Sequence, residues 1–144
     1  MKLALAVAFL SLAPSVLHAG TTIHVPDDVA TIQGAIALAQ DGDTVLVAPG
    51  TYPEALDFLG KAITVTSAGG AALTTIDAAT AFDSAVTFHT GEGPGSVLRG
   101  FTVQGGDSSQ RAGGISCFGT APTSPLVQHC IIRDNRTNLG LAGG

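Results

Sequence analysis

Five apolar positions of this chain recur at one constant offset in the numbering, which is 29. Val86, Phe88, Leu98, Phe101 and Val103 are followed by Ile115, Cys117, Val127, Cys130 and Ile132. The residues between them share little beyond glycine and polar character. Self-similarity at a fixed period indicates a repeat architecture, in which each unit buries its apolar side chains only against its neighbours. The constant offset therefore predicts one turn, or rung, of a repeating fold.

The pattern inside a rung predicts strands. Val86 and Phe88 alternate as in a strand with one face inward. Arg99-Gly100 separates two inward positions and predicts a bend, and Gln128-His129 occupies the same place one rung later. Each rung is therefore expected to contain a strand, a loop, a second strand, a bend and a third strand. Successive rungs are expected to pair in parallel.

Earlier segments fit the same scheme with shorter rungs. Residues 44–47, 62–66 and 74–77 are rich in β-branched side chains and are bounded by glycine or proline, which predicts strands, with a turn at 49–52. The apolar pair at 45 and 47 recurs at 63 and 65, an offset of 18, and that pair recurs at 86 and 88, an offset of 23. Variable length with fixed apolar pairs predicts an all-β coil of strands with rungs from about residue 44.

One amphipathic helix is predicted before these strands, over residues 28–40. Val29, Ile32, Ala35, Ile36 and Ala39 recur at helical spacing. The residues that could start the helix as hydrogen-bond acceptors are Asp27, Asp28 or Thr31, and Asp41-Gly42 can end it. A short helix with one apolar stripe must bury it against another element. We expect it to cap the first end of the coil.

The first residues predict export. Lys2 precedes an apolar stretch at 3–13, Pro14 interrupts it, and Ala19 offers a small residue for cleavage. We interpret residues 1–19 as a signal peptide and 20–144 as the β domain of a secreted or periplasmic protein. No later apolar run approaches the roughly 18 residues of a membrane helix, so no membrane span is predicted.

The charge of the chain indicates which partners it can bind. The formal net charge is −5, and the six Lys and Arg residues are scattered, whereas nucleic-acid binding needs clustered cations. Nucleic acid is therefore excluded as a partner.

Gly113-Gly114 stands directly before the inward Ile115, and Gly143-Gly144 recurs about one rung later, at the end of the sequence. The last rung is therefore expected to be unfinished within this sequence.

The segment from residue 23 to 77 carries a family resemblance. Its motifs are Thr31-Ile32-Gln33, Gly42-Asp43-Thr44-Val45, Pro49-Gly50-Thr51-Tyr52, Lys61-Ala62-Ile63-Thr64-Val65 and Thr75-Ile76-Asp77. These motifs resemble the opening of right-handed parallel β-helix proteins of the pectate-lyase-like superfamily, and the start of pectin methylesterases. The resemblance implies a right-handed parallel β-helix, a solenoid with an N-terminal capping helix. It implies less about activity, because the superfamily includes lyases, hydrolases, esterases, adhesins and inert passengers.

Catalytic residues do not carry over from that resemblance. The esterases use Asp residues in stretches reading about Gln-Asp-Thr-Leu and Asp-Phe-Ile-Phe-Gly, and neither stretch occurs here. A lyase needs carboxylates that hold a divalent cation such as calcium, and a basic side chain that removes a proton. Surface candidates for those roles are Asp107, Arg111, Arg133 and Asp134, although exposed Asp and Arg are ordinary in loops. His24, His89 and His129 are too widely spaced to predict a metal site.

The expected function is binding of a polysaccharide or a cell-envelope component, without cofactor and without catalysis in this segment. The first alternative is a polysaccharide-processing enzyme, a lyase or an esterase, whose catalytic rungs lie beyond residue 144; calcium belongs only to the lyase. A third hypothesis is a structural passenger that extends a surface fibre. In each case an uncapped last rung is an open strand edge, which favours self-association.

Some single residues carry expectations of their own. Cys117 and Cys130 stand at the positions of two inward Phe residues, so we expect buried thiols, with a disulfide as the alternative. Asn135-Arg136-Thr137 matches a glycosylation sequon, and Asn is also typical of tight turns. Glu54 and Asp57 are expected on an exposed loop.

Overall fold

The computed structural model describes residues 19–138. Most of the predicted signal peptide and the residues after 138, including Gly143-Gly144, lie outside the described residues. The described chain is mostly β, which confirms the all-β class, and its one helix is too short to cross a membrane. Its elements in order are β1 (Thr22–Val25), α1 (Ile32–Leu38), β2 (Thr44–Val47), β3 (Gly50–Tyr52), β4 (Leu56–Asp57), β5 (Thr64–Ser67), β6 (Thr74–Asp77), β7 (Val86–Phe88), β8 (Val97–Arg99), β9 (Thr102–Gln104), β10 (Asp107–Ser108), β11 (Ile115–Cys117), β12 (Leu126–Gln128), β13 (Ile131–Ile132) and β14 (Arg136–Thr137).

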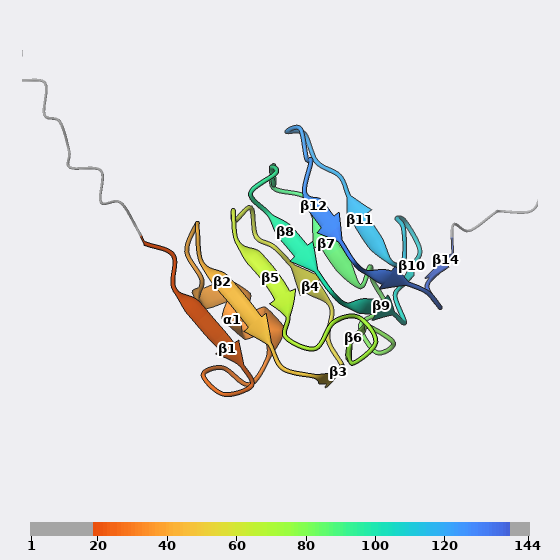
Figure 1. The fold of residues 1–144 in the computed structure, drawn as a ribbon. Helices are drawn as coiled ribbons and strands as arrows, with labels where there is room; N and C mark the ends of the chain where they lie inside the picture. The colour runs from red at the N-terminus through yellow and green to blue at the C-terminus, as the bar shows by residue number, and fades with distance from the viewer. Residues whose placement is uncertain (1–18, 139–144) are drawn as a thin grey trace, which may run out of the picture.

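The strands pair in parallel throughout the described residues. They form a five-stranded sheet (β1-β2-β5-β8-β12), a four-stranded sheet (β3-β6-β9-β13), a three-stranded sheet (β4-β7-β11) and a β10-β14 pair. Figure 1 shows the five-stranded sheet advancing in chain order, from β1 at the end that carries α1 to β12 at the other end.

Consecutive strands enter different sheets in a repeating order. The chain passes through the five-, four- and three-stranded sheets with β2, β3 and β4, and then again with β5, β6 and β7. It returns to them a third time with β8, β9 and β11. Parallel neighbours need a crossover connection, and here each crossover contains the strands of the other sheets.

The predicted offset of 29 is confirmed by the register. The partners are Val86 and Ile115, Leu98 and Val127, and Val103 and Ile132. The predicted bends are also present, since both Gly100 and His129 have positive φ, of 78° and 52°.

The two shorter offsets are wrong. Val45 lies opposite Val65, whereas the predicted partner was Ile63. Val65 then lies opposite Leu98, and Val86 pairs instead with Leu56 in the three-stranded sheet. The second of the shorter offsets therefore joined strands of different sheets. Apolar alternation reports which side chains face inward, and it does not report which strand is the neighbour.

Inward side chains stack in columns between the sheets. Val45, Val65 and Leu98 follow one another across the five-stranded sheet, and each is fully buried. The rings of Phe58 and Phe88 lie 4.4 Å apart between centroids, at an interplanar angle of 37°. Burial of each such side chain contributes about 1.5–3 kcal/mol, so these columns are the main source of stability.

Helix α1 starts later and ends earlier than predicted. Thr31 is its N-cap, and the Thr31 hydroxyl accepts a hydrogen bond from the amide of Gly34 at 3.1 Å. Asp28 does not start the helix, because its carboxylate accepts a hydrogen bond from the amide of His24 at 2.8 Å, in the turn after β1. The buried face of α1 packs near β1, β2 and β4.

Two side chains from later in the chain hold the ends of α1. The carboxylate of Glu54 accepts hydrogen bonds from the amides of Ile32 and Gln33, at 2.9 and 2.8 Å. Lys61 Nζ donates to three carbonyl oxygens at the other end, those of Ile36, Ala37 and Ala39, at 2.8, 2.7 and 2.8 Å. The negative charge of Glu54 at the N-terminal end and the positive charge of Lys61 at the C-terminal end both interact favourably with the helix dipole. Glu54, expected on an exposed loop, is thus part of the helix cap.

Five short strands differ from the sequence-based prediction. Residues 50–52 form β3, paired with β6, where a turn was predicted. Strands β1, β4, β10 and β14 were not predicted at all, and Asp57 therefore lies on a strand rather than on a loop. Short strands with mostly polar or partly exposed side chains carry little apolar alternation, and only pairing with a neighbour defines them.

Strands β11, β12 and β13 form the end of the molecule opposite α1 (Figure 1). The apolar residues Leu126, Val127, Ile131 and Ile132 are 37–53% exposed there, although Val127 and Ile132 follow the buried Leu98 and Val103 in register. Cys117 is exposed and Cys130 is partly buried, and both thiols are free. The expectation of a buried Cys117 is wrong because no described strand pairs with β11 on its outer side.

Candidate functional site

A cleft of about 470 Å³ opens on the solvent side of the three-stranded sheet. Leu56 and Val86 face the core from this sheet. Asp57 and Thr87 lie opposite one another in register and face outward. The cleft lining includes Gln33, Asp57, Asp83, His89, Arg111 and Phe118. Its volume is in the range of small-ligand sites in proteins, about 300–1,000 Å³.

A carboxylate and an imidazole meet in this cleft. Asp57 Oδ2 lies 2.9 Å from His89 Nε2, and the two side chains are 35% and 38% exposed. A carboxylate only accepts hydrogen bonds, so the imidazole proton of this pair is assigned to Nε2. His89 Nδ1 then keeps its lone pair, and its neighbour is the hydroxyl of Thr90, 3.5 Å away.

Hydrogen bonds from Leu59 and Gln33 fix the position of Asp57. Its Oδ1 accepts a hydrogen bond from the amide of Leu59 at 2.9 Å. The side-chain amide of Gln33 on α1 bonds both main-chain groups of Asp57, accepting from its N–H at 2.8 Å and donating to its carbonyl at 3.1 Å. The helix that caps the fold therefore also fixes the position of Asp57.

The ring of Phe118 contacts both the imidazole of His89 and the guanidinium of Arg111. The His89 and Phe118 rings are stacked, with centroids 5.3 Å apart and an interplanar angle of 13°. The guanidinium carbon of Arg111 lies 3.7 Å from the centroid of Phe118, which is a cation–π contact. No carboxylate among residues 19–138 forms an ion pair with Arg111. Its N–H donors are therefore available to a ligand in the cleft.

A buried carboxylate supports the loop behind His89. Glu92 is 1% exposed, and its two oxygens accept hydrogen bonds from the amides of Gly60 and Thr90, at 2.9 and 2.8 Å. These bonds tie the turn after β7 to the turn after β4. Because buried carboxylates are costly unless hydrogen-bonded, Glu92 is a structural group whose partners fix both turns.

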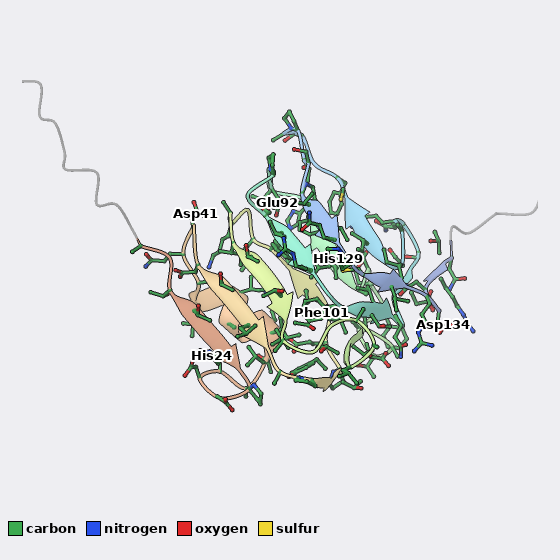
Figure 2. The ribbon with its side chains drawn as sticks, viewed as in Figure 1. His24, Asp41, Glu92, Phe101, His129 and Asp134 are labelled. Atoms are coloured by element: carbon green, nitrogen blue, oxygen red, sulfur yellow. The ribbon has the colours of Figure 1, made fainter. Side chains whose placement is uncertain are left out.

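The four surface candidates from the sequence do not gather in one place. Asp107 and Asp134 line another hollow, of about 250 Å³, with Arg136. Arg133 Nε lies 3.8 Å from Asp134 Oδ2 in an exposed pair, of the kind that contributes at most about 1 kcal/mol. Figure 2 shows Asp134 at the end of the molecule near β14. Arg111 alone lines the larger cleft.

Metal binding finds no support in the described part of the chain. Within residues 19–138, no three His, Cys, Asp or Glu side chains lie close enough together to hold a metal ion. His24 lies at the β1 end, far from His129 (Figure 2). The carboxylates of Asp57 and Asp107 are instead engaged by neighbouring hydrogen-bond donors.

The sequon asparagine holds a turn. Asn135 Oδ1 accepts a hydrogen bond from the amide of Gly106 at 2.9 Å. Its Nδ2 donates to the carbonyl oxygens of Val103 and Arg133, at 3.0 and 2.8 Å. A glycan on Nδ2 would replace one of the hydrogens that make these bonds. The contacts therefore favour the tight-turn interpretation of this motif.

Three ionisable groups elsewhere have pKa values moved by their surroundings. Partial burial raises the pKa of the Cys117 thiol, and the negative charge of Glu92 adds to this effect. Burial likewise raises the pKa of Tyr52, with smaller contributions from nearby carboxylates. The backbone amide of His24 lowers the pKa of Asp28, and the His24 side chain lowers it further.

Sequence reasoning missed most of the cleft residues. Asp57 was expected on a loop, and His89 was considered only as a metal ligand, a role that its spacing does not predict. One signal was present: His89 follows the inward Phe88, and Phe118 follows Cys117, the position that corresponds to Phe88 one rung later. The repeat therefore places His89 and Phe118 side by side on the outer face. Asp57 gave no such signal, because the connection between β4 and β7 has a different length.

Comparisons of this chain with protein-family models, curated proteins and solved structures found no match.

Proposed function

We propose that this chain is a secreted or periplasmic right-handed parallel β-helix protein that binds a polysaccharide or another glycan of the cell envelope. The repeated order in which the chain enters three parallel sheets supports the β-helix. Right-handedness follows from the strong preference of parallel crossover connections. The opening motifs that resemble the pectate-lyase-like superfamily support the same fold.

The cleft over β4, β7 and β11 is the observation that carries the binding function. It presents an amide (Gln33), a carboxylate (Asp57), an imidazole (His89) and, on the Phe118 ring, a guanidinium (Arg111) that has no ion-pair partner among residues 19–138. Sugars offer many hydroxyl groups together with C–H faces. A cleft that combines donors, acceptors and an aromatic group is suited to both.

Retention on immobilised polysaccharides tests this function. The panel consists of pectin, alginate, xylan and cellulose, and the variants are Arg111→Gln and, as a matched control, Arg99→Gln. Arg99 is exposed on the five-stranded sheet, outside the cleft, where it bonds Gln128 Oε1 at 2.6 and 3.1 Å. We expect retention of the native chain on at least one polysaccharide, about tenfold weaker binding in Arg111→Gln, and no change in Arg99→Gln. Absence of retention on the whole panel would contradict the proposal.

The same panel separates the alternatives. Cleavage or demethylation of pectin or alginate by the chain would favour a processing enzyme, and a requirement for calcium would favour a lyase. The absence of both retention and cleavage would favour a structural passenger.

A further inference from the structure

We propose that the cleft also hydrolyses O-acyl esters of the glycan it binds. In this site His89 is the general base, Asp57 is its positioning residue, and Arg111 binds the negative charge that develops on the ester. This inference rests on the proposed function for the identity of the substrate, and it extends that function from binding to chemistry.

The first support is the geometry of the base. A catalytic imidazole needs one nitrogen fixed by an acceptor and the other free to take a proton. Asp57 Oδ2 fixes His89 Nε2 at 2.9 Å, and the Leu59 amide fixes the same carboxylate from its other oxygen at 2.9 Å. Stacking on Phe118 fixes the plane of the imidazole ring. The hydrogen bond at the ring edge and the stacking on the ring face therefore fix the orientation of His89.

The second support is a cation within reach of the same ligand. Arg111 and His89 contact the same Phe118 ring, with the guanidinium carbon at 3.7 Å and the imidazole centroid at 5.3 Å from the ring centroid. The guanidinium has no carboxylate partner within residues 19–138. Both side chains line the same cleft, and a cation in such a site can stabilise the oxyanion formed by attack on a carbonyl group.

The third support is the identity of the nucleophile. The side-chain hydroxyl nearest to His89 belongs to Thr90, and its 3.5 Å distance from Nδ1 is at the outer limit of a hydrogen bond. Water is therefore the attacking group. A glycosidase would instead use two carboxyl groups, one as acid and one as base or nucleophile. The cleft holds two, but Asp57 is engaged by His89, and Asp83 accepts a hydrogen bond from the amide of Ser84 at 2.7 Å.

The reaction balances without a further reactant. Water attacks the acyl carbon, His89 Nδ1 takes the proton that water loses, and the carbonyl electron pair moves onto the oxygen beside Arg111. The carbonyl then re-forms as the bond to the sugar oxygen breaks, and the imidazolium returns its proton to that oxygen. The products are a carboxylic acid and a free sugar hydroxyl, and His89 is again neutral.

Acetate release from acetylated xylan, together with hydrolysis of 4-nitrophenyl acetate, tests the proposal. The matched control is the His24–Asp28 pair, an exposed imidazole and carboxylate 3.1 Å apart on the turn after β1, outside the cleft. We expect kcat/KM on acetylated xylan to fall about 100-fold in His89→Gln. It should stay unchanged in His24→Gln. A native rate no higher than that of His89→Gln would overturn the proposal.

The positioning role of Asp57 has its own readout. Asp57→Asn should lower kcat about tenfold with KM unchanged, and Asp57→Glu should recover part of that loss. A merely structural role would lower the melting temperature without separating kcat from KM, and that result would contradict the assignment.

Binding and hydrolysis can fail separately. Retention of His89→Gln on deacetylated xylan reports binding alone. Retention with no acetate release by the native chain would leave the proposed function standing and overturn this inference. Release of acetate without measurable retention would do the reverse.

Discussion

Left-handed backbone positions mark the turns between the strands. His129 stands where the preceding turn has Gly100, and both adopt positive φ, of 52° and 78°. Asp134 stands where the preceding turn has Gly105, again with positive φ at both positions, of 53° and 74°. The turn geometry thus continues from one rung to the next although the glycine does not. A side chain in this region costs about 1–2 kcal/mol relative to ordinary backbone.

Replacing His129 with glycine should therefore stabilise the protein. The substitution removes the cost of holding a side chain in left-handed backbone. The larger conformational entropy of glycine in the unfolded state opposes this gain in part, so we expect the free energy of unfolding to rise by about 0.5–1 kcal/mol. Denaturant unfolding measures it. Gly100→Ala is the reciprocal variant and should destabilise; a loss of stability in His129→Gly would contradict this account of the turn.

The thiol of Cys117 should react slowly for an exposed residue. Its pKa is raised above the ordinary value of 9.0 by partial burial and by Glu92, so less of the reactive thiolate is present at pH 8. We expect alkylation by iodoacetamide to be slower than that of a small free thiol at pH 8 and to speed up above pH 9. Mass spectrometry of the Cys117 peptide follows the reaction. Rapid alkylation at pH 7 would contradict the shift.

At the scale of elements, α1 depends on groups outside itself. A helix of seven residues is not stable in water on its own. It is held by burial of Ile32, Ala35 and Ile36 and by charged groups at both ends, Glu54 and Lys61. The helix and the first strands therefore form as one unit. Gln33 extends this unit to the cleft, since it is the helix residue that positions Asp57.

Lys61→Met should lower the free energy of unfolding by about 1–2 kcal/mol. The substitution keeps most of the aliphatic stem and removes three hydrogen bonds to carbonyl oxygens at the end of the helix, two of which are partly buried. Urea unfolding measures the change. Arg99→Met is the control: its bonds to Gln128 are exposed, and we expect a loss below about 0.5 kcal/mol. Equal effects of the two variants would contradict the capping role of Lys61.

At the scale of the whole molecule, the two ends differ. Helix α1 packs at the β1 end, whereas at the other end β11, β12 and β13 present apolar side chains and strand edges that no described strand pairs with (Figure 1). Such an edge pairs readily with another strand. The apolar residues there continue the register of the core, so the end is suited to pairing with a further strand layer.

A polypeptide of residues 20–144 should self-associate through this end. Light scattering after size exclusion should show oligomers, and Ile131→Lys with Ile132→Lys should shift them toward monomer, because two charges per chain oppose strand stacking. Leu38→Lys is the control, since Leu38 is 68% exposed and lies on α1, at the opposite end of the molecule. A monomeric native peak with a cooperative melt would contradict the prediction.

The sequence alone determined the periodic part of the protein. The constant offset between rungs, the inward apolar residues and the bends at Gly100 and His129 follow from alternation and turn chemistry, which act over short stretches of chain. The same reasoning predicted a helix near residues 28–40 and included Thr31, its N-cap, among the possible starts, but it did not predict the two charged groups at its ends. Glu54 and Lys61 lie far along the chain from their partners, so no local pattern marks them.

Only the tertiary structure decided the register of the early strands and the composition of the cleft. Val45 could pair with Ile63 or Val65 as far as alternation is concerned, and the sheet chose Val65. Asp57, His89 and Arg111 come from three successive passes of the chain, and they meet because parallel stacking places outward side chains of different turns side by side. Apolar side chains repeat because every rung must fill the same core. Outward side chains have no such common constraint, so the site they form becomes visible only once the strands are stacked.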